Sequence, residues 1–135
     1  MAFWTDEQMH SIDKMLNPRS IAVVGASPKS GGYGGRLFDA LLKSKDRVRL
    51  YPVNPNYDEI KGLKSYKRIS DLPEAPDLVG VVVPYNHVLD VLQESHARGA
   101  GSAVVISAGF AERGIESRLE LQKKIGAFAR ESGLR

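Results

Sequence analysis

The sequence predicts an α/β fold, a Rossmann-like doubly wound parallel sheet in three layers, with an additional helix at the amino terminus. Short runs rich in Val and Ile alternate along the chain with segments whose apolar residues recur at helical spacing. The Val/Ile runs are continuously apolar, which is typical of strands covered on both faces. Such strands, when they alternate with helices, pair in parallel through right-handed crossovers.

An opening helix is predicted first, because Thr5 and Gln8 match a capping box and Asn17–Pro18 ends the apolar periodicity. Four strands follow, each leading into a connection that returns the chain across the sheet. Asn86 is expected to cap the helix after the third strand, and Gly99 to end it. The strands are residues 20–24, 47–53, 77–83 and 102–107, and helices are expected at residues 35–44, 87–98 and 115–131.

Two parts of the chain leave the prediction open. Between Asn56 and Pro76 the pattern is ambiguous, and residues 63–72 fit either a short helix or a loop. Gly133 is expected to end the last helix. A doubly wound fold would continue there with a fifth strand. Residues 1–135 therefore fit a single domain that is either the amino-terminal part of a longer protein or a natural four-stranded domain.

Composition narrows the class of protein. The chain has 135 residues, of which 42% are hydrophobic and 26% charged, as expected for one globular domain. Its net charge of +3 is too small to indicate nucleic-acid binding, but it leaves an anionic ligand open. The absence of cysteine excludes disulfides, zinc–thiolate sites and thiol nucleophiles. No targeting signal opens the chain and its apolar runs are short. We therefore expect a cytoplasmic protein that does not span a membrane.

Four loops are expected at the ligand-binding edge, because open parallel sheets bind ligands beyond the carboxyl ends of their strands. These loops are residues 25–35, 54–57, 84–87 and 107–114. The first contains five glycines in eleven residues, between a strand and a helix. Glycines let backbone N–H groups approach a phosphate, and a helix amino terminus adds partial positive charge. This loop is predicted to bind phosphate; the alternative is a flexible connection.

A dinucleotide is disfavoured as the ligand. The segment from Tyr51 to Asn54 ends the second strand without the acidic residue that holds the ribose of NAD, and the glycine spacing is not G-x-G-x-x-G. No Gly-Lys-Ser/Thr closes the loop as in a P-loop. NADP remains an alternative through Arg47 and Arg49, although their alternation on a strand favours a solvated face.

No catalytic or metal-binding residue is predicted. Paired carboxylates, nucleophile–base sets and metal-ligand spacings do not stand out in the sequence. The three histidines, His10, His87 and His96, form no constellation, and of them His87 borders the expected site. We therefore expect this chain by itself to bind a ligand rather than to transform it.

Four ordered blocks resemble the CoA-binding domain of NDP-forming acyl-CoA synthetases. The resemblance extends over residues 16–135, and it is stronger to ADP-forming acetyl-CoA synthetases than to the succinyl-CoA synthetase alpha subunit. The blocks are residues 18–28 (PRSIAVVGASP), 51–55 (YPVNP), 83–84 (VP) and 106–110 (ISAGF).

This resemblance implies that the domain binds coenzyme A, as CoA or acyl-CoA, in place of a dinucleotide. In the family, CoA takes an acyl group that has passed through an acyl phosphate and a phosphohistidine in a later domain. The implied partners are therefore the remaining domains or subunits of the synthetase. Together, the loops and the resemblance give these candidate CoA-binding residues: Gly25, Ala26, Ser27, Pro28, Lys29, Ser30, Asn54, Pro55, Val83, Pro84, Ile106, Ser107 and Ala108.

The chain departs from the family pattern in two places. Members often carry a Lys directly after the Asn–Pro block, whereas here Asn56–Tyr57 follows and the next lysine is Lys61. Succinyl-type members have a Glu where this chain has Ala108, which favours the acetyl-type branch. The alternatives are a stand-alone CoA-binding or regulatory protein, the CoA-binding domain of a protein acetyltransferase, and a fragment of an NADP-dependent oxidoreductase.

Overall fold

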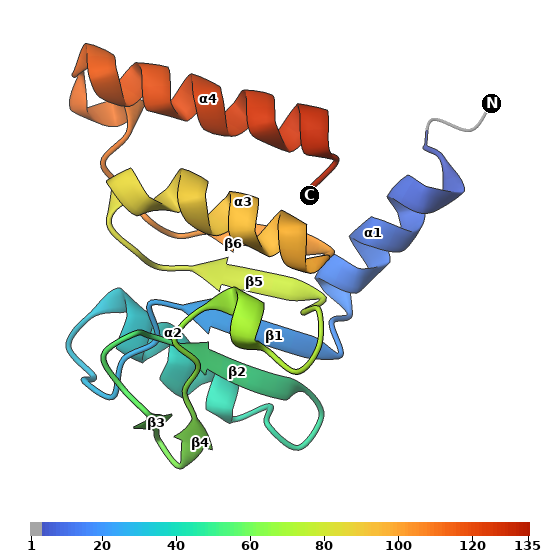
Figure 1. The fold of residues 1–135 in the computed structure, drawn as a ribbon, viewed down its shortest axis with the longest axis vertical. Helices are drawn as coiled ribbons and strands as arrows, with labels where there is room; N and C mark the ends of the chain where they lie inside the picture. The colour runs from blue at the N-terminus through green and yellow to red at the C-terminus, as the bar shows by residue number, and fades with distance from the viewer. Residues whose placement is uncertain (1–3) are drawn as a thin grey trace.

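A parallel four-stranded sheet forms the centre of the fold (Figure 1). The computed structural model describes residues 4–135; residues 1–3, on which part of the targeting argument rests, lie outside it. The strand order is β2–β1–β5–β6, and each neighbouring pair is parallel. This confirms the predicted Rossmann-like α/β fold. The strands are β1 (Ser20–Val24), β2 (Arg49–Val53), β5 (Leu78–Val81) and β6 (Ser102–Val105).

Helices cover both faces of the sheet, with α2 on one face and α3 and α4 on the other (Figure 1). The helix α1 precedes the sheet, and three short 3-10 turns lie in the connections. The helices are α1 (Asp6–Leu16), α2 (Tyr33–Leu42), α3 (Val88–Arg98) and α4 (Glu116–Ser132). The 3-10 turns are η1 (Ile69–Asp71), η2 (Tyr85–His87) and η3 (Ala111–Arg113).

The central strand β1 contributes to two hydrophobic cores. Ile21 and Val23 pack on the α2 face with Phe38, whose side chain is fully buried. Ala22 and Val24 belong to the opposite core, to which α3 contributes Val88 and Leu92 and α4 contributes Ile125 and Phe128. Successive residues of a strand point to opposite faces. A strand buried on both faces therefore shows a continuous apolar run, here residues 21–24, as predicted.

The helix ends follow the predicted signals in most places. Thr5 and Gln8 form the capping box of α1, in which the Thr5 hydroxyl accepts from the Gln8 N–H at 3.2 Å and the Gln8 side chain accepts in return at 2.8 Å. Gly99 ends α3 and Gly133 ends α4, both in the left-handed conformation. Among residues 4–135, no helix combines the length and apolar character needed to cross a bilayer.

The prediction that Asn86 caps a helix is wrong. Asn86 lies inside η2, and α3 begins two residues later at Val88, with His87 as an N-cap that makes no side-chain capping bond. The boundaries of other elements also shift: β5 and β6 are shorter than predicted, and α2 begins two residues earlier, at Tyr33.

The ambiguous segment between β2 and β5 contains a small antiparallel hairpin. Its strands are β3 (Glu59–Ile60) and β4 (Leu63–Lys64), and η1 follows. Both turn residues have positive φ, 52° for Lys61 and 81° for Gly62, as a tight two-residue hairpin turn requires. Ile60 and Leu63 pack against the α2-side core. The hairpin therefore extends this core beyond the edge strand β2.

Candidate functional site

The carboxyl ends of β1, β2 and β5 are joined by backbone hydrogen bonds that continue beyond the strands. The Gly25 N–H donates to the carbonyl of Val53 at 3.0 Å, and the Val82 N–H donates to that of Val24 at 2.9 Å. Gly25 has a φ of +95°, and a Cβ at this position would lie 1.9 Å from the Val82 carbonyl oxygen. Only glycine fits here, and it brings the backbones of β1 and β5 together where the loops begin.

Asn54 connects three segments at this edge. Its side-chain amide donates to the carbonyl of Ala26 at 2.9 Å, and its side-chain oxygen accepts from the Asn56 N–H at 2.9 Å. Its own backbone N–H donates to the carbonyl of Tyr66 at 2.9 Å. The Asn54 side chain thus connects the glycine-rich loop to the loop after β2. It stabilises the arrangement of both loops at the carboxyl ends of the strands.

Ser107 likewise connects two segments, those that follow β5 and β6. Its hydroxyl accepts a hydrogen bond from the Val83 N–H at 3.1 Å and also contacts the carbonyl of Val81 at 3.5 Å. The segment after β6 is thereby held against the segment after β5. In the same loop, the Glu112 carboxylate accepts from the Gly109 and Phe110 N–H groups. The Gly109 hydrogen bond is the main reason that the pKa of Glu112 lies below its usual range.

The amino terminus of α2 packs directly on the glycine-rich loop. A Cβ at Gly34 would lie 2.1 Å from the Gly25 carbonyl oxygen, and one at Gly35 would lie 1.8 Å from that of Lys29. Gly32 is the N-cap, and no described side chain caps the first turn. The first N–H groups of a helix have no partner within the helix. They are therefore available to a ligand or to water.

Two cavities flank the segment after β5, residues 82–84. The β2-side cavity, of about 470 Å³, lies toward the end of β2, and the β6-side cavity, of about 440 Å³, lies toward the end of β6. The predicted residues that line the β2-side cavity are Gly25, Asn54, Pro55, Val83 and Pro84. Those that line the β6-side cavity are Val83, Pro84, Ile106, Ser107 and Ala108.

The remaining predicted residues, 26–30, line neither cavity in the described chain. Ala26 is fully buried, and Lys29 and Ser30 are exposed on the loop. The Ser27 hydroxyl accepts from the Lys29 N–H at 3.1 Å, which turns the loop toward α2. These residues therefore stand beside the two cavities, at the start of α2, and their contact with a ligand stays a prediction.

Several residues of the cavities were not among the predicted set. The β2-side cavity also includes Lys67, Arg68 and Glu94, and the β6-side cavity includes Tyr33. Lys67 and Arg68 come from the ambiguous segment, in which residues 63–72 fit either a short helix or a loop by sequence. His87 lines the β2-side cavity and so does border the site, as the sequence analysis expects.

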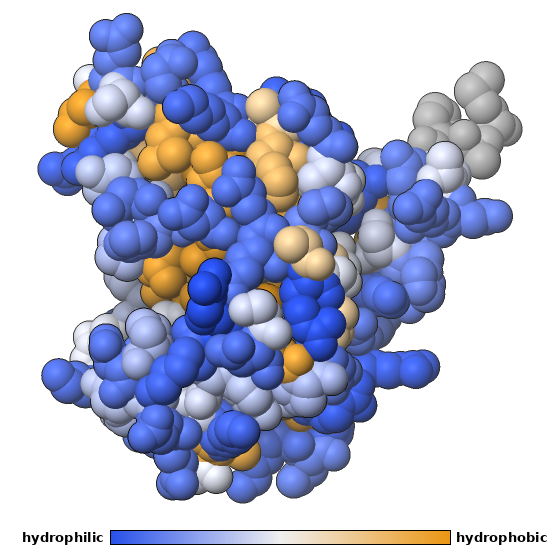
Figure 2. Space-filling view, viewed as in Figure 1, coloured by the Kyte–Doolittle hydropathy of each residue, from blue (hydrophilic) through white to orange (hydrophobic). Residues whose placement is uncertain are grey.

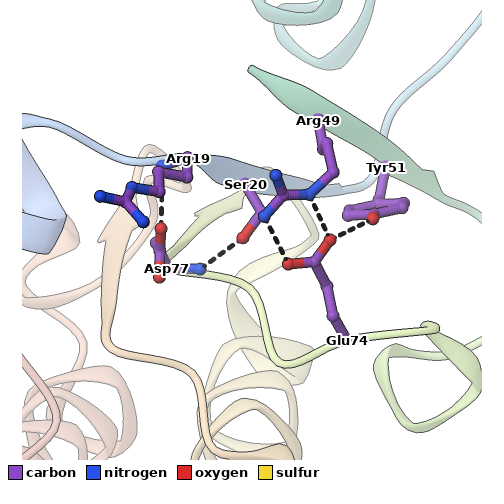
Figure 3. A network of polar contacts seen from close by, with 6 residues as sticks. All are labelled: Arg19, Ser20, Arg49, Tyr51, Glu74 and Asp77. Carbon is purple, nitrogen blue, oxygen red and sulfur yellow. Dashed lines mark hydrogen bonds and ion pairs between the residues drawn. The ribbon is translucent and has the colours of Figure 1, made fainter. Parts of the chain in front are cut away.

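Arg49 lies at the amino end of β2, away from the strand ends beside which the cavities lie. Figure 3 shows its side chain beside Glu74 and Tyr51. Arg49 is the first residue of β2, whereas the ligand loop follows the last, Val53. Its guanidinium pairs with the Glu74 carboxylate at 2.6 and 2.8 Å, and the Tyr51 hydroxyl donates to the same carboxylate. The NADP alternative depends on Arg47 or Arg49. The Arg49 side chain does not support it, because residue 49 opens the strand and is paired with Glu74.

This ion pair is expected to make the stability of the fold depend on pH. The hydrogen bond from Arg49 is the main reason that the pKa of Glu74 falls from 4.5 to about 2. A carboxyl whose pKa is lowered by folding stabilises the fold above the unfolded pKa. That stabilisation is lost as the pH falls from about 4.5 toward about 2. We expect the ion pair to contribute only about 1 kcal/mol to the free energy of unfolding, because Arg49 is largely exposed and water screens the pair.

Urea unfolding at pH 6 and at pH 3 measures this effect. Glu74→Gln should lower the free energy of unfolding at the higher pH and approach the wild type at the lower one. The matched control is Glu120→Gln, since Glu120 forms an exposed pair with Lys123 on the surface of α4. Parallel pH profiles for wild type and Glu74→Gln would contradict the assignment.

The histidines occupy three separate places. His10 is exposed on α1, and the ring of His96 packs edge-on against Phe128 at 5.9 Å. Of the three histidines, His87 is the one that lines the β2-side cavity. Within residues 4–135, no group of three or more His, Cys, Asp or Glu side chains is arranged to hold a metal ion.

Comparison with known proteins shows which family the chain belongs to. Residues 19–135 match the family described as CoA binding domain. The chain is 39% identical over 126 residues to the alpha subunit of acetate–CoA ligase (ADP-forming) II of Pyrococcus furiosus, covering 92% of this chain and 27% of that subunit. It is also 39% identical over 123 residues to the trans-feruloyl-CoA synthase FCS1 of an unknown prokaryotic organism, covering 91% of this chain and 17% of that enzyme.

A solved structure shares the fold at a similar level of identity. It is a dinucleotide forming acetyl-coenzyme A synthetase 1 of Candidatus Korarchaeum cryptofilum, in complex with phosphate and ADP, with a TM-score of 0.83 and 37% identity over 92% of this chain and 26% of that one. This chain thus spans about a quarter or less of these larger enzymes. It belongs to the CoA-binding domain family and is homologous to the ADP-forming acyl-CoA ligases.

Proposed function

We propose that this chain holds coenzyme A for an ADP-forming acid–CoA ligase, so that the CoA thiol can take an acyl group from an acyl phosphate. The observation that carries the proposal is the pair of cavities on either side of residues 82–84, at the edge where parallel sheets bind ligands. Together they offer an extended site, which suits a long ligand. The names of the relatives, an acetate–CoA ligase and a feruloyl-CoA synthase, support coenzyme A as the ligand and an acyl group as the group it takes up.

In this proposal, backbone groups provide most of the phosphate binding. The uncapped first turn of α2 offers N–H groups and partial positive charge to an anion. Residues 27–30 precede it, and Lys29 adds a cation on the exposed loop. A single exposed lysine–phosphate pair contributes only about 1 kcal/mol. Affinity would therefore depend on the shape of the loop, which Gly25 and Asn54 maintain.

The chemistry of acyl transfer is assigned to other domains or subunits. The relatives are several times longer than this chain. A phosphohistidine domain and the acyl-phosphate step would lie in those other parts, in a cytoplasmic enzyme. The proposed work of residues 1–135 is to bind CoA, orient it along the edge of the sheet and present its thiol to the rest of the assembly.

Thermal unfolding in the presence of ligands tests the proposal. CoA at about 100 times its Kd should add about 2.7 kcal/mol to the free energy of unfolding, which corresponds to about 10 °C in Tm. NAD(H) and NADP(H) serve as controls, since both contain an adenosine diphosphate and NADP(H) also carries a phosphate monoester as CoA does. Both should leave Tm unchanged. A Tm that rises with a nicotinamide nucleotide but not with CoA or acyl-CoA would defeat the proposal.

A further inference from the structure

The two cavities differ in charge. Of the described residues that line the β6-side cavity, none is charged, whereas the β2-side cavity includes Lys67, Arg68 and Glu94. The β2-side cavity also has apolar lining residues, among them Val24, Val53 and Ile69. Figure 2 shows apolar surface below α3, toward the carboxyl ends of the strands, with hydrophilic residues around it. A charged group of a ligand is therefore better matched to the β2-side cavity.

Arg68 is placed at this cavity by hydrogen bonds to the end of β2. The Tyr66 N–H donates to the carbonyl of Pro52 at 2.9 Å, and the Asn54 N–H donates to the carbonyl of Tyr66 at 2.9 Å. The next apolar residue, Ile69, is buried in the core beside it. The backbone of residue 68 is thus anchored on both sides, while its side chain is 69% exposed.

Lys67 and Arg68 differ in how far their charges are already engaged. The Lys67 ammonium pairs with Asp58 at 2.8 Å and donates to the carbonyl of Tyr57 at 3.2 Å. Arg68 approaches its partner less closely, with its Nε 3.5 Å from Glu94 Oε1. In the described chain this is the only ion pair of Arg68. Since a guanidinium carries five N–H donors, most of them remain for another acceptor.

Glu94 has a second contact that holds it in place. Its Oε1 accepts a hydrogen bond from the Ser70 N–H at 3.1 Å, across from α3 to η1. A carboxylate fixed in this way stands beside Arg68 but does not form a bidentate pair with it. It lowers the local positive charge without occupying the donor face of the guanidinium.

We propose that Arg68 recognises the 3′-phosphate of CoA in the β2-side cavity, in competition with Glu94. This inference rests on the proposed function. A phosphate monoester carries between one and two negative charges at neutral pH, and arginine binds it through paired N–H groups. The phosphate therefore competes well for Arg68 against the Glu94 carboxylate, whose Oε1 lies 3.5 Å from the Arg68 Nε. Arg68 supplies the cation that the chain lacks directly after Pro55.

Calorimetric titration with CoA and dephospho-CoA tests this assignment, because the two ligands differ only in the 3′-phosphate. Wild-type protein should bind CoA more tightly. Arg68→Gln should weaken CoA binding roughly fivefold and dephospho-CoA binding by less than about twofold. Glu94→Gln should act in the opposite direction and strengthen CoA binding roughly threefold. Its amide oxygen can still accept from the Ser70 N–H.

A charge-matched control separates local contact from the general field of the protein. Arg47→Gln removes the same charge from an exposed position before β2, at the edge away from the cavities. It should leave the ratio of the two affinities unchanged. The inference would be overturned if Arg68→Gln lost the same affinity for CoA as for dephospho-CoA, or if Glu94→Gln left the ratio of the two affinities unchanged. Either result would leave the proposed function standing. Failure of the wild type to bind either ligand would overturn the proposed function itself.

Discussion

Gly25→Ala is expected to disrupt the carboxyl edge of the sheet and abolish CoA binding. The new Cβ would lie 1.9 Å from the Val82 carbonyl oxygen, which itself belongs to the backbone and cannot rotate away. The positive φ of +95° adds strain for any side chain. We expect a loss of more than about 3 kcal/mol in the free energy of unfolding, measured with urea. Gly25→Val, with a branched Cβ, should be worse.

Gly62→Ala is the control for the strain alone. Gly62 also has a positive φ, +81°, but a Cβ there would meet nothing within 4 Å. Its cost should therefore be limited to about 1–2 kcal/mol, with CoA binding retained. Equal losses of stability in the two variants would show that the close approach of β1 and β5 is not what requires glycine at position 25.

Gly35→Ala is expected to destabilise the protein although it places a better helix former inside α2. In an ordinary helix this change stabilises by about 1 kcal/mol. Here the new Cβ would lie 1.8 Å from the Lys29 carbonyl oxygen, so the helix and the glycine-rich loop would have to separate. We expect a loss of about 2–3 kcal/mol and weaker CoA binding, since the loop would move from the start of α2.

Gly126→Ala gives the matched comparison in α4. The nearest atom to a Cβ at Gly126 is the end of the flexible Arg130 side chain, at 3.4 Å. This variant should gain about 0.5–1 kcal/mol. Opposite signs for the two substitutions in urea unfolding would support the close packing of α2 on the loop. A gain at both positions would contradict it.

The sheet and the loops at the carboxyl ends of its strands were predictable because their signals are local and repeated. The continuous apolar run of residues 21–24 reflects a strand that faces two cores, and Gly25 marks the point where β1 meets β5. The capping box at Thr5 and the helix stops at Gly99 and Gly133 depend on single residues with a strong conformational preference. Such features do not require knowledge of tertiary contacts.

The segment between β2 and β5 was not predictable in the same way. Strands of two residues are too short to display a period, and the turn uses Lys61–Gly62 rather than the commoner Asn–Gly. The position of Arg68 depends on hydrogen bonds between Tyr66 and the end of β2, which are remote in sequence. Asn86 was misplaced because Pro84 is followed by a 3-10 turn before α3 begins. Tertiary contacts decide these features.

We propose that CoA lies along the carboxyl ends of the strands and is held largely by backbone N–H groups. Mapping of backbone amide shifts by NMR during a CoA titration tests it most directly. The largest changes should fall on Gly25, on Ser27 and residues 29–32, and on the non-proline residues after β5 and β6. Saturable changes confined to α1 or to the outer surface of α4, with these amides unmoved, would contradict the account.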